Sequence, residues 1–210
     1  MTRRQNVVIL AESAVMIALS TVLSLIKLFD LPQGGSVTAF SLLPLALLAY
    51  RRGVGVGLGA GFVYSVLQLL LGLKNIAWVP TAWGIALCVL LDYILPYTAF
   101  GLCGMFRRVR FCKNERTNRI IGILLGILPV MLFRYVCHIL SGVLVWYALD
   151  LEWYADDPDH LVFRYGAWAF SAIYNGSFLL PETAVTMVSA AALVPIDAIG
   201  RPIPAQKKSA

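Results

Sequence analysis

Three polar side chains stand inside long apolar stretches of this sequence: the carboxylate of Asp92, the imidazole of His138 and the amide of Asn175. An ionisable group at the centre of a bilayer costs about 3 kcal/mol on insertion scales, so a chain keeps one only where it faces protein or a water-filled cavity. Together the three groups can donate and accept hydrogen bonds to a polar ligand. They therefore predict a binding pocket enclosed by apolar elements.

The three residues are expected at similar depths in the outer half of the membrane. Counted from the outer ends of their segments, they stand about ten, eleven and eight residues in, and a helix rises about 1.5 Å per residue. Polar groups backed by aromatic faces suit a flat, nitrogen-rich ligand, including a cationic one. The candidate ring faces are Trp83, Trp146, Phe170 and Tyr174.

Each of these residues also has a simpler interpretation. Trp146 could belong to the aromatic belt at the membrane surface, and Asn175 could join two helices by a hydrogen bond. His138 could be a satisfied interior group, and Arg134 in the same segment could neutralise Asp92. The coincidence of the three polar groups in depth favours the pocket.

The first and last segments carry features that are expected outside this pocket. Glu12 and Glu182 are acids within apolar segments, but both are expected nearer the cytoplasmic ends. Ala14 and Ala18 are four residues apart, a spacing of small residues that lets another helix approach closely. This pair is a candidate contact for a partner helix.

The composition identifies the elements that must position these groups. Of the 210 residues, 60% are hydrophobic and 13% are charged, which is typical of an integral membrane protein rather than a soluble domain. Stretches of about 20 apolar residues predict an all-α fold of six transmembrane helices in a single domain, residues 1–210. The expected spans are about 7–29, 37–50, 54–73, 82–106, 120–149 and 167–194.

The distribution of Lys and Arg predicts the orientation. Counted on alternate sides of the six spans, thirteen cations fall on one face, including Lys207 and Lys208, so the positive-inside rule places both termini in the cytoplasm. These clusters are not interleaved with the aromatic residues of a base-stacking surface, so we expect no nucleic-acid partner. The largest outer loop, 150–166, is rich in acids. Two interpretations are open: an acidic, aromatic vestibule that favours a cationic solute, or a loop that is simply solvated.

Several kinds of chemistry find little support. The sequence contains no GxxxxGK[ST] phosphate-binding loop, and its cysteines lack the spacing of a metal site or a disulfide framework. An intramembrane hydrolase using Ser141 or Ser177 with His138 is an alternative. A hydroxyl on a helix more often bonds to its own backbone, so a binding protein is favoured over an enzyme.

Four stretches together resemble the thiamine-specific S component (ThiT family) of energy-coupling factor (ECF) vitamin transporters. They read LLPLALLAYRRGVGVGLGAGFVYSVLQ, LLDYILPYTAFGL, FRYVCHILSGVLVW and AFSAIYNGSFLLPE. The resemblance implies a six-helix protein of the bacterial cell membrane that binds thiamine from outside with high affinity. It also implies association with a transmembrane coupling subunit, through the surface of Ala14 and Ala18, and with two ATPase subunits. No cofactor of its own is implied.

The resemblance also implies roles for individual residues. Asp92 would contact the aminopyrimidine, and His138, Trp146 and Asn175 stand at the family's other ligand positions. Phe170 occupies a position where a tyrosine is typical of the family, and Asp92 is one methylene shorter than the glutamate of some members. An S component for another flat heterocycle, such as a thiamine precursor or riboflavin, is the alternative within this class.

Overall fold

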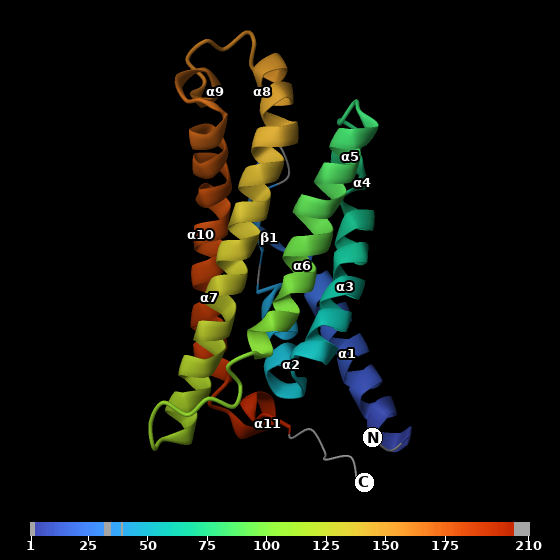
Figure 1. Cartoon of the computed structure of the whole chain (residues 1–210), viewed down its shortest axis with the longest axis vertical. Helices are drawn as coiled ribbons and strands as arrows, with labels where there is room; N and C mark the ends of the chain where they lie inside the picture. The colour runs from blue at the N-terminus through green and yellow to red at the C-terminus, as the bar shows by residue number, and fades with distance from the viewer. Residues whose placement is uncertain (1–2, 32–34, 39, 204–210) are drawn as a thin grey trace.

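The computed structural model describes residues 3–31, 35–38 and 40–203, which are mostly helical (Figure 1). Within these described residues, five helical segments are long and apolar enough to cross a membrane. Of the six spans predicted from the sequence, the first and third correspond to the single helices α1 (Arg3–Ser24) and α3 (Val54–Leu71). The last predicted span corresponds to α10 (Ala167–Leu193). The other two segments, Ala82–Gly104 and Glu115–Trp153, are helices interrupted by turns of different pitch.

The structure differs from the sequence prediction at the second segment, 37–50. Its first residues form strand β2 (Ser36–Thr38), and the rest forms helix α2 (Leu43–Arg52), whose ten residues rise about 15 Å against the roughly 30 Å of a hydrocarbon core. The helix begins beside Pro44, which suits a first helical turn, and residues 43–50 are all buried. This segment is therefore a short interior helix rather than a regular spanning helix.

The first segment also ends earlier than expected. Helix α1 stops at Ser24, and Lys27–Asp30 forms strand β1, which pairs antiparallel with β2 in the register Phe29↔Val37. The chain therefore descends from the end of α1 through a hairpin and then α2, which lies at the same end of the bundle as the start of α1 (Figure 1). Strand and short helix together replace the predicted second span.

Two π-helical turns interrupt the long helices on either side of the bundle interior. The segment after α5 (Ala82–Cys88) is the π turn η1 (Val89–Ile94), followed by α6 (Leu95–Thr98) and the 3₁₀ turn η2 (Ala99–Gly104). Helix α7 (Glu115–Ser141) passes into the π turn η3 (Gly142–Trp146) and then α8 (Tyr147–Trp153). Such turns are frequent at functional sites, and these two contain Asp92 and Trp146. The remaining helices are short: α4 (Leu73–Ile76), α9 (Leu161–Arg164) and α11 (Asp197–Gly200).

Arginines tie the elements together at the end of the bundle where α11 lies. Arg51 and Arg52 both pair with Glu12 of α1, and Arg119 Nη1 donates to Asp197 Oδ1 at 2.5 Å. This contact holds the pKa of the Asp197 carboxyl below its usual value. The cytoplasmic location of this end stays a prediction, and Lys207 and Lys208 lie outside the described residues.

The backbone of α3 approaches the segment formed by α6 and η2 closely. A Cβ at Gly101 would meet backbone atoms of Leu58 and Gly57, and a Cβ at Gly61 would meet the carbonyl oxygen of Tyr97 at 2.7 Å. Glycine at these positions therefore allows the two helices to pack against one another.

This packing predicts the effect of adding one methyl group. Gly101→Ala should lower the free energy of unfolding by about 1–3 kcal/mol, because the methyl group forces the backbones apart. Gly59→Ala is the matched control: a Cβ there meets nothing within 4 Å, so it should be neutral or raise stability by up to about 1 kcal/mol through helix propensity. Equal unfolding temperatures of the two variants in detergent would contradict this account.

Candidate functional site

A cavity of about 400 Å³ opens between the hairpin, α3, η1, α7, η3 and α10. Its volume falls within the roughly 300–1,000 Å³ of small-molecule sites. Six of the seven residues predicted for the pocket line it: Asp92, His138, Trp146, Phe170, Tyr174 and Asn175. The fold thus brings together Asp92, His138 and Asn175, the three polar side chains that were expected at similar depths.

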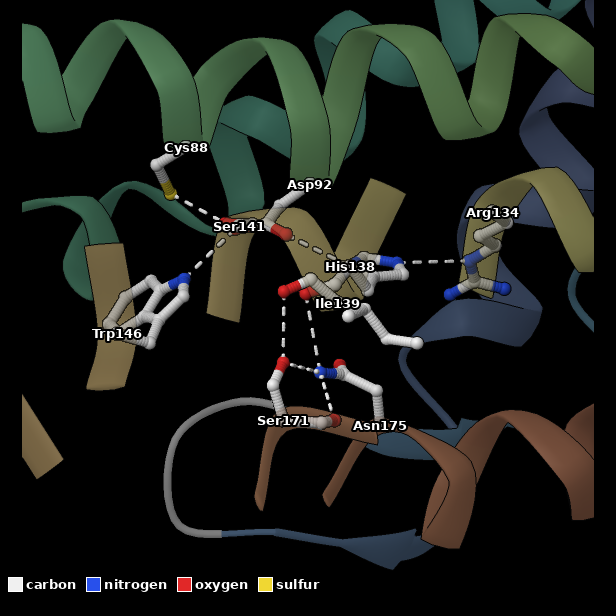
Figure 2. A network of polar contacts seen from close by, with 9 residues as sticks. All are labelled: Cys88, Asp92, Arg134, His138, Ile139, Ser141, Trp146, Ser171 and Asn175. Atoms are coloured by element: carbon white, nitrogen blue, oxygen red, sulfur yellow. Dashed lines mark hydrogen bonds and ion pairs between the residues drawn. The ribbon is translucent and has the colours of Figure 1, made fainter. Parts of the chain in front are cut away.

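The carboxylate of Asp92 is the centre of a hydrogen-bond network in the wall of this cavity (Figure 2). Its Oδ2 accepts from Ser141 Oγ at 2.6 Å and from Trp146 Nε1 at 3.0 Å. The thiol of Cys88 donates to the same oxygen at 3.3 Å. Oδ1 lies 2.9 Å from His138 Nδ1. Since a carboxylate offers roughly four acceptor positions, Oδ2 is fully used, and Oδ1 can accept one further donor.

The tautomer of His138 follows from its two neighbours. Arg134 Nε, which can only donate, lies 3.3 Å from His138 Nε2. Nε2 is therefore the acceptor, and the ring carries its proton on Nδ1, which donates to Asp92. A neutral imidazole thus connects the cation of Arg134 to the anion of Asp92 (Figure 2).

Arg134 forms a buried ion pair with Glu182 of α10. Arg134 Nη1 lies 2.7 Å from Glu182 Oε2, and the two side chains are 5% and 3% exposed. The guanidinium also lies over the ring of Tyr97, 5.1 Å from its centroid. The other carboxylate oxygen, Oε1, accepts from Thr38 Oγ1 of β2 at 2.9 Å. A chain of polar contacts therefore runs from the hairpin through α10 and α7 to η1.

These polar contacts correct two interpretations that were made from the sequence. Glu182 was expected outside the pocket, but it lines the cavity. Neutralisation of Asp92 by Arg134 was the simpler interpretation of Asp92, but the ion pair of Arg134 is with Glu182. Helical spacing could have indicated both: Glu182 is seven residues from Asn175 and Arg134 is four from His138, so each pair shares a helix face.

Asn175 links α10 to α7. Its Nδ2 donates to the carbonyl of His138 at 3.3 Å, and to the carbonyl and hydroxyl oxygens of Ser171 at 2.9 and 3.2 Å. Ser171 Oγ in turn donates to the carbonyl of Ile139 at 3.0 Å (Figure 2). These bonds fix the amide at the cavity wall and join the two helices, so both interpretations of Asn175 apply.

The aromatic predictions differ in outcome. Phe170 and Tyr174 lie together in the wall, with ring centroids 6.2 Å apart. Trp146 faces the cavity and also donates to Asp92, a role that its belt interpretation did not contain. Trp83 is wrongly assigned: its side chain is 73% exposed and does not line the cavity. Trp78, which the sequence analysis missed, lines it from the connection after α4.

The acidic segment 150–166 is only partly a solvated loop. Asp150 belongs to α8, is 3% exposed and lines the cavity. Glu152, two residues further along the same helix, is exposed. The two acids therefore occupy opposite environments, because positions two apart on a helix do not share a face.

The remaining candidates lie away from the cavity or are engaged elsewhere. Ala14 and Ala18 are exposed on one side of α1, where a partner helix could approach. Ser141 Oγ donates to Asp92 rather than to His138, and Ser177 Oγ donates to the carbonyl of Tyr174. Neither serine donates to His138, the base that the hydrolase alternative requires, so the geometry gives that alternative no support.

Comparison with known proteins relates the chain to vitamin transporters. The family described as thiamine transporter protein (Thia_YuaJ) matches residues 10–198. The thiamine transporter ThiT of Bacillus subtilis (strain 168) is 26% identical over 187 residues, which cover 87% of this chain and 88% of that protein. ThiT of Lacticaseibacillus paracasei (strain ATCC 334) is 27% identical over 208 residues, covering 93% and 91%.

A solved structure of ThiT from Listeria monocytogenes has a similar fold. It superposes with a TM-score of 0.69 at 24% identity, and the match covers 90% of this chain and 94% of that one. At this identity the likeness is evidence of a shared fold.

The buried ion pair predicts a non-additive response to mutation. Arg134→Met should lower the free energy of unfolding by about 3–5 kcal/mol, because it leaves the Glu182 carboxylate buried without its cation. Combining it with Glu182→Gln removes that isolated charge and should restore part of the loss. Denaturant or thermal unfolding in detergent measures both effects.

Arg164→Met provides the control for this cycle. Arg164 pairs with Asp159 at 3.0 Å, but the pair is exposed, so the change should be under about 1 kcal/mol. If the double variant were as unstable as the sum of its single variants, the pairing of Arg134 with Glu182 would not determine stability here.

Proposed function

Because the chain belongs to the thiamine transporter protein family (Thia_YuaJ), we propose that it is the thiamine-binding S component of an ECF-type importer in a bacterial plasma membrane. The observation that carries this proposal is the family match over residues 10–198, nearly the whole chain. A ligand-sized cavity lined by polar and aromatic side chains supports it. The protein captures its ligand by binding and is not itself an enzyme.

The geometry of the network supports a specific placement of the aminopyrimidine. Asp92 Oδ1 keeps room for one more donor beside His138 Nδ1, and an amino group of the ligand can occupy it. A hydrogen bond to a charged acceptor is stronger than one between neutral groups. The donors on Oδ2 hold the carboxylate in orientation before the ligand arrives, so binding loses less side-chain entropy.

The aromatic residues enclose the rings of the ligand in this proposal. Trp146 is held in the wall by its bond to Asp92, with its indole available as a ring face. Phe170 and Tyr174 line the same cavity from α10. An apolar enclosure of this kind favours planar, partly cationic ligands through cation–π attraction.

Transport requires partners that this chain does not contain. The sequence carries no phosphate-binding loop, so ATP hydrolysis belongs to two ATPase subunits that act through a transmembrane coupling subunit. Ala14 and Ala18, exposed on α1, are the proposed contact for the coupling subunit, because small residues let helices approach closely. Both termini are proposed to be cytoplasmic.

Titration with thiamine, followed by intrinsic tryptophan fluorescence, tests the proposal. Saturable quenching at submicromolar thiamine is expected, because Trp146 lies against the ligand. Asp92→Asn should weaken binding roughly tenfold or more, since the amide replaces a charged acceptor. Trp83→Phe should leave the affinity unchanged, because Trp83 lies outside the cavity.

Competition identifies the ligand class. Riboflavin should bind more weakly than thiamine. Tighter binding of riboflavin or of a thiamine precursor would redirect the substrate assignment to another heterocycle. No quenching or competition by thiamine, in protein with its native unfolding transition, would reject the proposed function.

A further inference from the structure

A second cavity lies at the end of the bundle where α11 is found (Figure 1). Its volume is about 740 Å³. Its walls come from the end of α2, the loop after η2, the start of α7 and the segment 197–203. It shares no lining residue with the cavity that contains Asp92. Its occupant is therefore a separate question from the ligand proposed above.

Arginine dominates the charge of this second cavity. Among the described lining residues, six arginines face two carboxylates, Glu115 and Asp197, which leaves four positive charges. Glu12, which does not line the cavity, pairs with Arg51 at 3.1 Å and still leaves a surplus of three. The six arginines are Arg51, Arg107, Arg108, Arg110, Arg119 and Arg201. A concave surface with one sign of charge concentrates ligands of the opposite sign, so the cavity favours an anion.

The choice of arginine narrows the kind of anion. Every cation among the described lining residues is an arginine, although Lys113 lies in the same loop. Membrane orientation requires positive charge of either kind, so it does not account for this preference. A guanidinium forms two parallel hydrogen bonds to the oxygens of a phosphate, whereas an ammonium acts as a point charge. Several such groups around one cavity suit a phosphate, whose oxygens can accept from more than one arginine.

Hydrogen bonds join the segments that form the cavity. The carbonyl oxygen of Arg51 accepts from Arg107 Nη1 at 2.9 Å and from the backbone N–H of Ile203 at 2.9 Å. Asn118 of α7 is 8% exposed, and its Oδ1 accepts from the backbone N–H of Phe111 at 2.8 Å. The basic loop, α2 and the segment 197–203 are therefore held around one cavity.

The arginines of the loop are the ones available to a ligand. Within the described residues, neither Arg108 nor Arg110 forms an ion pair with a carboxylate, and both are exposed. Arg119, in contrast, is buried and pairs with Asp197. Burial and the neighbouring charge of Arg108 lower the pKa of Arg107. An anion between Arg107 and Arg108 would relieve the repulsion between them.

The surroundings of the loop favour a lipid as the carrier of the phosphate. Val109 lines the cavity, and Val109, Met105 and Phe111 are exposed apolar side chains beside the arginines. Helix α7 begins at Glu115 in the cavity wall, and its segment is long and apolar enough to cross a membrane. The cavity is thus placed where the chain leaves the apolar layer, and basic pockets at that level bind the headgroups of anionic lipids.

We propose that the arginine-lined cavity binds a phosphate group, and that an anionic phospholipid of the surrounding membrane carries it. Arg108 and Arg110 contact the phosphate, and the exposed apolar side chains of the same loop lie against the acyl chains. This inference goes beyond the proposed function, because it does not depend on the ligand of the first cavity.

Native mass spectrometry of the detergent-solubilised full chain tests the lipid preference. It compares the affinity for phosphatidylglycerol with that for phosphatidylcholine, in which the choline balances the charge of the phosphate. The wild-type protein should prefer phosphatidylglycerol roughly twentyfold or more. Arg108→Gln combined with Arg110→Gln should remove most of this preference, at about fivefold for each arginine removed. Binding of phosphatidylcholine should change by less than about twofold, because it carries no net charge.

Arg3→Gln combined with Arg4→Gln is the matched control. It removes the same two charges from exposed positions at the start of α1, at the same end of the bundle but outside the cavity (Figure 1). This variant should keep the wild-type preference for phosphatidylglycerol. An unchanged unfolding temperature shows that each variant is folded. If the Arg108 and Arg110 double variant does not fold, the two single variants are measured in its place.

Calorimetric titration with inorganic phosphate separates the two sources of the phosphate group. Binding to the wild-type protein that is lost in the Arg108 and Arg110 double variant would identify a free phosphate as a ligand of the cavity. Absence of such binding, together with the lipid preference, would identify the lipid headgroup.

Three results would overturn the inference. They are a lipid preference that is unchanged in the Arg108 and Arg110 double variant, an equal loss of preference in the Arg3 and Arg4 control, and a wild-type protein that neither prefers phosphatidylglycerol nor binds inorganic phosphate. None of them bears on thiamine binding. A protein that prefers phosphatidylglycerol but does not bind thiamine would reject only the proposed function.

Discussion

The constraint on which this structure depends is the cost of charge in an apolar bundle. Glu182, Arg134, His138 and Asp92 lie in contact from α10 through α7 to η1, and each charge meets an opposite charge or a donor at hydrogen-bond distance. Breaking such a chain at one point leaves a buried charge uncompensated, which costs far more than the intact pairs contribute. The cavity wall can therefore hold ionised groups only while the helices that carry them keep their relative positions.

The π turns explain how these side chains reach one another. A π turn adds a residue to one turn of helix and so changes the direction of the side chains that follow. Asp92 lies in one such turn and Trp146 in the other, and their side chains meet across the gap between η1 and η3 at 3.0 Å. Regular helices of the same length would repeat every 3.6 residues without this adjustment. The irregular backbone is thus part of the site.

Sequence reasoning could predict the groups whose burial has a high cost, and it failed where position depends on backbone irregularity. Asp92, His138 and Asn175 were recognisable because polar side chains inside apolar segments need partners. Glu182 was misplaced because its depth was counted from the end of the segment instead of from Asn175 on the same face. Trp83 and Asp150 were misassigned since composition says nothing about where a helix begins or which face it turns inward. The strand–helix form of 37–50 was hidden by its apolar composition, which suits a buried short helix as well as a spanning one.

The hairpin connects this chain of charged groups to the cavity. Thr38 of β2 donates to Glu182, and residues of both strands line the same cavity as Asp92 and Asn175. The hairpin is thus held by the same carboxylate that balances Arg134, and Arg134 orients the histidine that donates to Asp92. His138 is therefore three contacts away from Thr38 of the hairpin, and Asp92 is four contacts away. Because polar groups in a low-dielectric interior are costly to leave unpaired, these contacts fix the hairpin relative to Glu182 and Arg134 in the cavity wall.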